Sequence, residues 1–351
     1  MSAVLGAFGL LLLATSSIWL GSVLGSKKPE PKDDEINEEE TIELTWSQVL
    51  MMPISSSIFL LLLFYFFAYL QLILVFFVIL GSALSCAEVI KSSIASFVPC
   101  LNGKISTVFS AVFTVFVVAQ WAMNGSFIAH DILGCSICIS SIALIRFPSL
   151  KLAAVCLGLL LLYDIFWVFF SEYFFQKNVM VEVATKSASN PLQAVGEMYH
   201  ISMLMALQPK LDLPIKLLIQ ASTLPGSRVM MLGLGDIALP GFLVSFALRC
   251  DMYQTHRLSL PQYSPESLLL QDSRNSKSNT SKGPGSANLF EFSMIGYILG
   301  LLLAFYIGSI SGHAQPALIY LVPGVVIPIA ARAWQKNIFL EVWNGPSKSS
   351  D

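Results

Sequence analysis

Two aspartates stand alone inside apolar stretches of this sequence, and together they could catalyse a hydrolysis. Asp164 lies in the middle of residues 158–172 (GLLLLYDIFWVFFSE), and Asp236 lies within residues 230–246 (MMLGLGDIALPGFLVSF). A lone carboxylate in hydrocarbon costs several kcal/mol, so such residues usually have a partner or a function. We therefore treat Asp164 and Asp236 as a pair around which the rest of the chain is arranged.

Facing carboxylates in an apolar site do not readily both ionise, so one keeps a proton and the two titrate as a coupled dyad. Such a dyad can carry out aspartyl proteolysis. The ionised acid takes a proton from a water molecule, which attacks the peptide carbonyl. The protonated acid polarises that carbonyl and later helps to protonate the leaving nitrogen. This chemistry requires no metal and no other cofactor, and we predict none.

The composition indicates a membrane protein. Of the 351 residues, 55% are hydrophobic and only 12% are charged, whereas soluble domains carry about 25% charged residues. Many apolar runs reach roughly 18 residues, enough for a helix to cross a hydrocarbon core of about 30 Å. The net charge of −2 gives no indication of nucleic-acid binding. Cys135 and Cys138 form a CxxC pair inside one such run, without a second Cys or His pair nearby, so we expect no metal site there.

The apolar runs predict an all-α protein, a polytopic bundle of nine transmembrane helices. The predicted parts are a first span (1–25), an acidic cytosolic linker (26–48), spans two to five (49–146), a catalytic region with spans six to nine (147–343) and a cytosolic tail (344–351). We expect the catalytic region to contain a lumenal loop at 171–228 and a cytosolic loop at 249–288.

Three finer predictions concern local structure. Residues 49–86 are too long for one span and predict two helices joined near 67–71. Residues 179–183 (VMVEV) are β-prone, and residues 229–248 form the seventh apolar run. The first span is interpreted as uncleaved, with cleavage near residues 21–26 as the alternative.

Basic residues favour one orientation of the nine spans. With the N-terminus outside, 15 of the 20 Lys and Arg residues fall on the inner side. Since Lys and Arg gather in cytosolic segments, we expect a lumenal N-terminus and a cytosolic C-terminus. Asp164 then lies 12 residues from the cytosolic end of its span (164 − 152), and Asp236 also lies 12 from its own (248 − 236). Both depths are about 18 Å at 1.5 Å per residue, so the two acids can face each other.

Two further features, a pair of glycines and a third aspartate, have two interpretations each. Gly233 and Gly235 precede Asp236; they would ease local unwinding and let a substrate strand pair there, or they would serve helix packing. Asp131 lies next to His130 near a predicted helix end. It could be a third catalytic acid, although solvation at the membrane interface is the favoured interpretation.

Three short motifs follow one another in the sixth, seventh and ninth runs. They are Tyr163–Asp164 (YD), Gly233, Leu234, Gly235 and Asp236 (GLGD), and Gln315, Pro316, Ala317 and Leu318 (QPAL). Together they resemble the YD, GxGD and PAL motifs of the presenilin and signal peptide peptidase superfamily of intramembrane aspartyl proteases. The amino-acid sequence of residues 152–187 and 230–328 is similar to that of the signal peptide peptidase-like proteins, in particular the like-3 branch and plant relatives. The resemblance covers residues 46–343.

The resemblance implies a presenilin-like fold with Asp164 and Asp236 as the catalytic pair. The residues that would shape the site or seat the substrate are Tyr163, Gly233, Gly235, Gln315, Pro316, Ala317 and Leu318. The implied partners are membrane lipid and transmembrane proteins, of type II in the signal peptide peptidase branch. The like-3 branch implies the Golgi or endosomes, and the wider family the endoplasmic reticulum.

Two alternatives stay open from the residues alone. A transporter that relays protons through membrane acids would explain two buried aspartates, but it leaves the QPAL segment unexplained. A catalytically silent scaffold that binds membrane proteins would retain all of the motifs, and measurements of activity distinguish it.

Overall fold

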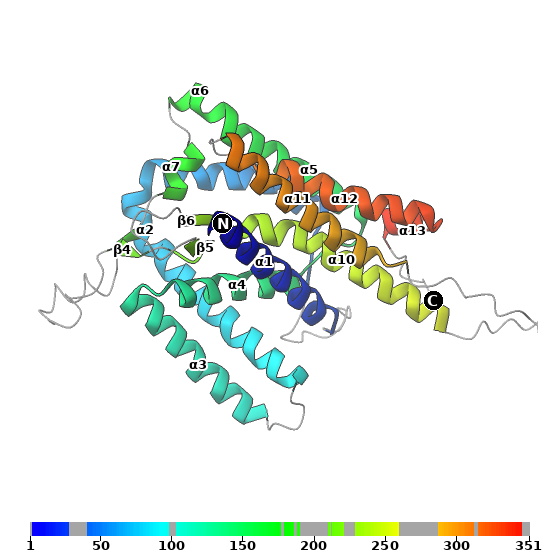
Figure 1. Cartoon of the computed structure of the whole chain (residues 1–351), viewed down its shortest axis with the longest axis horizontal. Coiled ribbons are helices and arrows are strands. Elements are labelled where there is room, and N and C mark those ends of the chain that lie inside the picture. The colour runs from blue at the N-terminus through cyan, green and yellow to red at the C-terminus, as the bar shows by residue number, and fades with distance from the viewer. Residues whose placement is uncertain are drawn as a thin grey trace, which may run out of the picture.

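The computed structural model describes residues 2–27, 41–97, 103–176, 179–185, 188–189, 210–211, 213–220, 229–259, 287–311 and 315–345. The long helices are α1 (Ser2–Lys27), α2 (Trp46–Phe97), α3 (Gly103–Asn124), α4 (Phe127–Leu144), α5 (Leu150–Ile165), α10 (Leu234–Ser259), α11 (Leu289–Ser311) and α12 (Leu318–Gln335). Shorter helical segments are the π-helix η1 (Phe166–Phe170), α6 (Ser171–Phe175), α7 (Val179–Thr185) and α13 (Phe339–Asn344). Figure 1 shows the long helices gathered into one bundle, with α3 at its edge.

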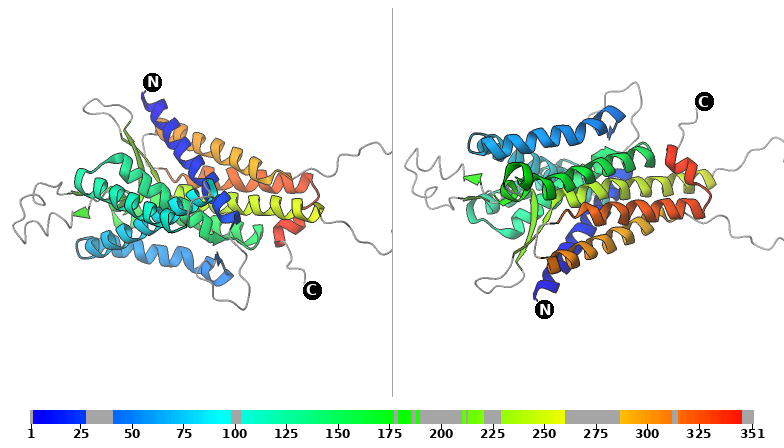
Figure 2. Two further views of the ribbon diagram at one scale, coloured as in Figure 1. Left: turned by 90° about the horizontal axis from the view of Figure 1, so that it is seen from below. Right: turned by 90° about the horizontal axis from the view of Figure 1, so that it is seen from above.

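Three short strand pairs accompany the helices. The strands are β1 (Ile42–Glu43), β2 (Ile145–Arg146), β3 (Ala188–Ser189), β4 (Lys210–Leu211), β5 (Lys216–Gln220) and β6 (Val229–Gly233). β1 pairs with β2 in parallel, and β3 pairs with β4 in antiparallel fashion. β5 and β6 form an antiparallel hairpin in which Lys216 lies opposite Gly233 and Gln220 opposite Val229. This hairpin leads directly into α10, and Figure 2 shows it at the end of the bundle opposite to α13.

The prediction of a mostly helical integral membrane protein is confirmed. Among the described residues, seven helical stretches are long and apolar enough to cross a membrane. Large apolar side chains also cover the outer surface; on α3, for example, Val108, Val112 and Val115 are all more than 60% exposed. Apolar surface of this extent suits contact with lipid. The predicted acidic linker lies mostly outside the described residues, as does most of the predicted cytosolic loop.

Of three local predictions, one agrees with the structure and two differ from it. The predicted division of residues 49–86 into two helices is confirmed: α2 consists of two helical arms joined at a kink, where Phe66 has non-helical dihedral angles (φ −116°, ψ 21°), one residue before the predicted junction at 67–71. Figure 1 shows the two arms of α2 diverging, one beside α5 and the other beside α3. Residues 229–233 of the seventh apolar run form a strand, because residues 216–220 pair with them. The β-prone residues 179–183 lie in α7, where the Val179 N–H donates to the Ser171 hydroxyl.

Close backbone packing joins α11 to α12. A Cβ at Gly296 would collide with the carbonyl oxygen of Gly324, and one at Gly300 would lie 2.8 Å from the carbonyl oxygen of Tyr320. Small residues allow membrane helices to approach in this way. The contact fixes the position of α12 against α11, and α12 begins at the QPAL segment.

The sixth run does not continue as a regular α-helix. After Asp164 the backbone widens into η1, and α6 then completes the run. The indole N–H of Trp167 in η1 donates to the Ser57 hydroxyl of α2 over 3.1 Å. Tyr163 and Trp167 lie with Leu60 and Val179 in one apolar cluster. The segment beyond Asp164 is thus attached to α2 and α7.

Asp251 of α10 caps the start of α11. Its two carboxylate oxygens accept the N–H groups of Leu289 and Phe290 over 3.0 and 2.9 Å. We expect Asp251→Ala to lower the free energy of unfolding by about 1–2 kcal/mol, because both donors lose their acceptor. Asp251→Asn retains one acceptor oxygen and should lose less. Thermal unfolding of the purified protein in nanodiscs measures the difference, and an alanine variant as stable as the wild type would contradict the prediction.

Candidate functional site

Asp164 lies near the end of α5 and faces the start of α12. Its residue is only 5% exposed, and its carboxylate accepts a hydrogen bond from the backbone N–H of Leu318. Leu318 is the first residue of α12, with Ala317 in the N-cap position. The first N–H groups of a helix have no partner within it, and they favour a negative charge. The QPAL segment thus directs a helix N-terminus at Asp164.

Asp236 is the third residue of α10, directly after the strand β6. It is close enough to Asp164 for the charge of one carboxylate to act on the other. A Cβ placed on Gly233 would lie 3.3 Å from the Oδ2 atom of Asp236. The hydroxyl of Tyr297, a fully buried residue of α11, donates to the backbone carbonyl of Asp236 over 3.4 Å. Strand β6, helix α10 and Tyr297 therefore hold the second acid.

The remaining predicted site residues lie around these two acids. Gly235 is exposed, and no other group lies within 4 Å of the position its Cβ would take. Gln315 precedes α12, and its side-chain oxygen accepts the hydroxyl of Tyr320 over 2.9 Å. Pro316 is buried. Tyr163 precedes Asp164 in α5 and packs its ring at a tilt against Trp167, with 6.4 Å between the ring centroids.

Sequence reasoning missed two contributions to this site. Tyr297 lies in an apolar run that contains no motif. Its only signal in the sequence is a hydroxyl group inside an apolar run, and the structure buries this residue. The N–H of Leu318 is a backbone group that no side-chain pattern reports. In both cases the contact joins helices that are distant in the sequence, so that only the packing of α11 and α12 reveals it.

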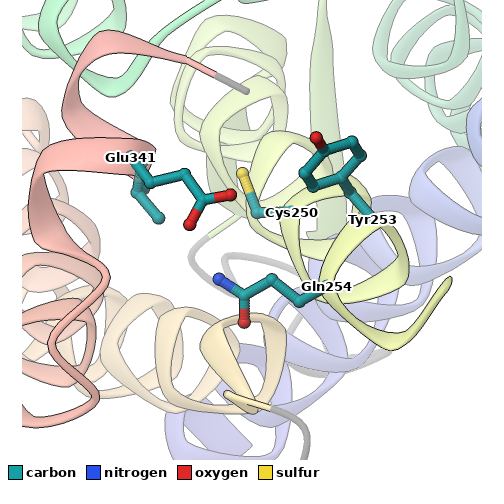
Figure 3. A pocket seen from close by; sticks show the side chains of 5 residues that line it. Cys250, Tyr253, Gln254 and Glu341 are labelled. Carbon is teal, nitrogen blue, oxygen red and sulfur yellow. The ribbon is translucent and has the colours of Figure 1, made fainter. Parts of the chain in front are cut away.

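A separate small hollow lies far from the acids. It is open to solvent and is lined by Cys250, Tyr253, Gln254, Glu341 and Val342. Figure 3 shows these side chains where the end of α10 meets α13. Cys250 follows Asp236 by 14 residues (250 − 236) in the same helix, which places the hollow about 21 Å away along the helix axis. It takes no part in the site.

The fold and the paired acids define the class of this protein, a helical integral membrane protein with two aspartates in its interior. Comparison with known proteins agrees. Residues 36–349 match the family model described as signal peptide peptidase, and the chain belongs to this family of intramembrane aspartyl proteases.

Two plant proteins illustrate the similarity. The chain is 34% identical to "Signal peptide peptidase-like 1" of Oryza sativa subsp. japonica, over 88% of this chain and 84% of the relative. It is also 34% identical to "Signal peptide peptidase-like 1" of Arabidopsis thaliana, over 89% and 85% of the two chains. "Signal peptide peptidase-like 2A" of Mus musculus is 26% identical, over 70% of this chain and 40% of the relative.

Proposed function

We propose that this protein hydrolyses peptide bonds inside the transmembrane segments of type II membrane proteins, with Asp164 and Asp236 as its catalytic dyad. One observation carries the proposal. Two acids from different apolar helices come within electrostatic reach of each other, and a helix N-terminus is directed at one of them. A transporter has no need of that arrangement together with the QPAL segment, and measurements of activity distinguish a silent scaffold.

The two acids divide the proton transfers. The N–H of Leu318 stabilises a negative charge on Asp164, so we assign to Asp164 the removal of a proton from the attacking water. Asp236, the protonated partner, polarises the scissile carbonyl and then helps to protonate the leaving nitrogen. Since both acids are needed for one cycle, neither can replace the other.

Among the described residues β6 pairs with β5 alone, and the other edge of β6 supplies a place for the substrate. The N–H of Leu234 donates to the carbonyl of Ile215, so even-numbered residues of the β6 segment face β5. The backbone groups of Met231 and Gly233 then point away from β5. An extended peptide can add to such a strand edge, and the open position at Gly235 leaves space beside Asp236. An unwound stretch of substrate would thereby lie next to the dyad.

We infer nine spans for this chain. α2 has 52 residues, about 78 Å at 1.5 Å per residue, which is more than twice a hydrocarbon core of about 30 Å. Its bend at Phe66 therefore separates two spans. α10, which carries Asp236, is not among the seven candidate helices, and we count it as a further span. Counting both raises the seven candidate helices to nine.

The arrangement of basic residues supports a cytosolic end of the bundle. Arg146 donates to the carbonyl of Gly25, Arg249 to that of Phe147, and Arg332 to that of Ala287. All three arginines are among the basic residues predicted on the inner side, whereas Lys216 lies in the β5–β6 hairpin at the opposite end of the bundle. We therefore propose a lumenal N-terminus and a cytosolic C-terminus. The resemblance to the like-3 branch supports the Golgi or endosomes, with the endoplasmic reticulum as the alternative.

Proteoliposomes that contain the purified protein and a model substrate test this function. One substrate has a type II orientation, and a matched substrate carries the same transmembrane sequence in a type I protein. We expect the type II substrate to be cut within the membrane, at least about tenfold faster, a difference of about 1.4 kcal/mol in the barrier. Equal cleavage of both would contradict the substrate class. An absence of cleavage across several substrates would favour the scaffold.

A further inference from the structure

Two adjacent polar residues near the start of α4, His130 and Asp131, have no role in the reaction described above. His130 is 2% exposed, and the Asp131 side chain is 13% exposed. The Nδ1 atom of His130 lies 3.0 Å from Oδ1 of Asp131, and its Nε2 atom lies 3.0 Å from the carbonyl oxygen of Leu213. Asp131 Oδ1 also accepts the backbone N–H of Leu218 over 2.9 Å.

These contacts hold the side of β5 that faces away from β6. The backbone groups of the odd-numbered residues of β5 face β6, so the N–H of Leu218 points away from β6. His130 binds the chain just before the strand, and Asp131 binds its middle. β5 is thus fixed along both of its edges, by β6 on one side and by α4 on the other.

α4 supports the hairpin beyond these two residues. A Cβ on Gly134 would lie 3.1 Å from Cδ2 of Leu217 and 3.6 Å from the carbonyl oxygen of Pro214, which indicates a tight fit. One turn further, the Sγ atom of Cys138 contacts the carbonyl oxygen of Leu234 over 3.7 Å. Leu234 is the first residue of α10, two positions before Asp236. The face of α4 that carries His130 therefore runs along the hairpin to the catalytic acid.

We propose that His130 and Asp131 are positioning residues, which fix the register of the β5–β6 hairpin relative to Asp236 and so determine which substrate bond is cut. The proposal rests on the function proposed above. A substrate that adds to β6 takes its register from that strand. A shift of one residue in a strand turns every side chain to the opposite face, so a loosened hairpin would offer neighbouring bonds to the dyad.

The test compares Asp131→Leu, Asp131→Asn and the matched control Ser136→Ala in proteoliposomes. Ser136 is also buried in α4, but its hydroxyl bonds only within its own helix, to Ile132. Mass spectrometry of the products gives the distribution of cut sites. For Asp131→Leu we expect cleavage to spread over adjacent bonds, with an initial rate lowered roughly tenfold, about 1.4 kcal/mol. Asp131→Asn retains an oxygen that accepts the Leu218 N–H and should restore the main cut site.

A merely structural role predicts a different pattern. Loss of stability alone would lower the rate of Asp131→Leu and leave the distribution of cut sites unchanged, which would overturn the proposal. His130→Gln provides a second variant should Asp131→Leu not fold. Its single amide nitrogen can take the place of only one of the two ring nitrogens, so this variant keeps at most one of the two contacts of His130 and we expect an intermediate spread. An unchanged distribution in His130→Gln would equally count against the proposal.

Hydrogen exchange separates this inference from the proposed function. Exchange of the amides in residues 213–220 is measured in nanodiscs without substrate, in wild type and variants. Faster exchange in Asp131→Leu and restored protection in Asp131→Asn would support the proposed positioning role of His130 and Asp131. Equal protection in all variants would overturn it. A wild type that cleaves nothing contradicts the proposed function. The exchange result then decides by itself whether His130 and Asp131 hold the hairpin.

Discussion

Asparagine in place of either Asp164 or Asp236 should abolish proteolysis, and the double variant should be no slower than either single one. Each acid supplies a proton transfer that its partner cannot, so loss of one disables the pair. We expect the rate to fall by roughly a thousandfold or more, as it does when one member of a catalytic unit is removed. Initial rates of cleavage of the type II substrate measure the effect.

The control for this prediction is Glu172→Gln. Glu172 lies in α6, exposed at the end of the same continuous helical run as Asp164. Its substitution removes one negative charge from that run without touching the dyad, so activity should be unchanged. Full activity in either single aspartate variant would refute the pairing. A double variant slower than both single ones would mean that the two acids act independently.

Gly296→Val should lower the rate of cleavage, although Gly296 is not part of the dyad. The new side chain would collide with the carbonyl oxygen of Gly324 and push α12 away from α11. Overpacking of this kind costs about 1–3 kcal/mol. The larger effect is functional, because α12 begins with Leu318, whose N–H binds Asp164. We expect the cleavage rate to fall at least about tenfold.

Gly308→Val on the same helix separates the two causes. Within the described part of the chain, a Cβ at Gly308 meets no group of another element within 4 Å, so this variant carries the same change in helix propensity without the collision. Thermal unfolding and initial cleavage rates are measured for both variants in nanodiscs. If Gly296→Val loses no more activity than Gly308→Val, then the α11–α12 contact does not position the site.

Part of this architecture could be predicted from the sequence because charge is so rare in it. Asp164 and Asp236 each interrupt an apolar run, and equal spacing from the run ends suggested equal depth. The structure brings these two acids together. Some apolar runs also agree with helices within a few residues; residues 290–310 are mostly apolar, and α11 covers Leu289–Ser311.

The differences lie where distant pairing decides the conformation. Residues 229–233 read as part of an apolar helix, because a short apolar run has no periodicity to distinguish strand from helix. They form β6 because Lys216–Gln220 pairs with them. Asp131 was interpreted as an acid solvated at the interface, yet its oxygen accepts the N–H of Leu218, 87 residues away. No local pattern could report that contact.

The π-helix η1 allows one membrane span to serve two neighbours. Asp164 and Trp167 are three residues apart, a spacing that puts side chains on the same side of a regular α-helix. Here Asp164 reaches α12, whereas Trp167 reaches Ser57 of α2. A π turn is equivalent to one inserted residue, so the span changes direction without a proline. The Ser171 N–H still donates to the Phe166 carbonyl, a backbone hydrogen bond that hydrocarbon could not replace. Deleting a single residue from Phe166–Phe170 would therefore rotate the residues after the π-helix as a rigid unit, leaving the part of the span that carries Asp164 in place.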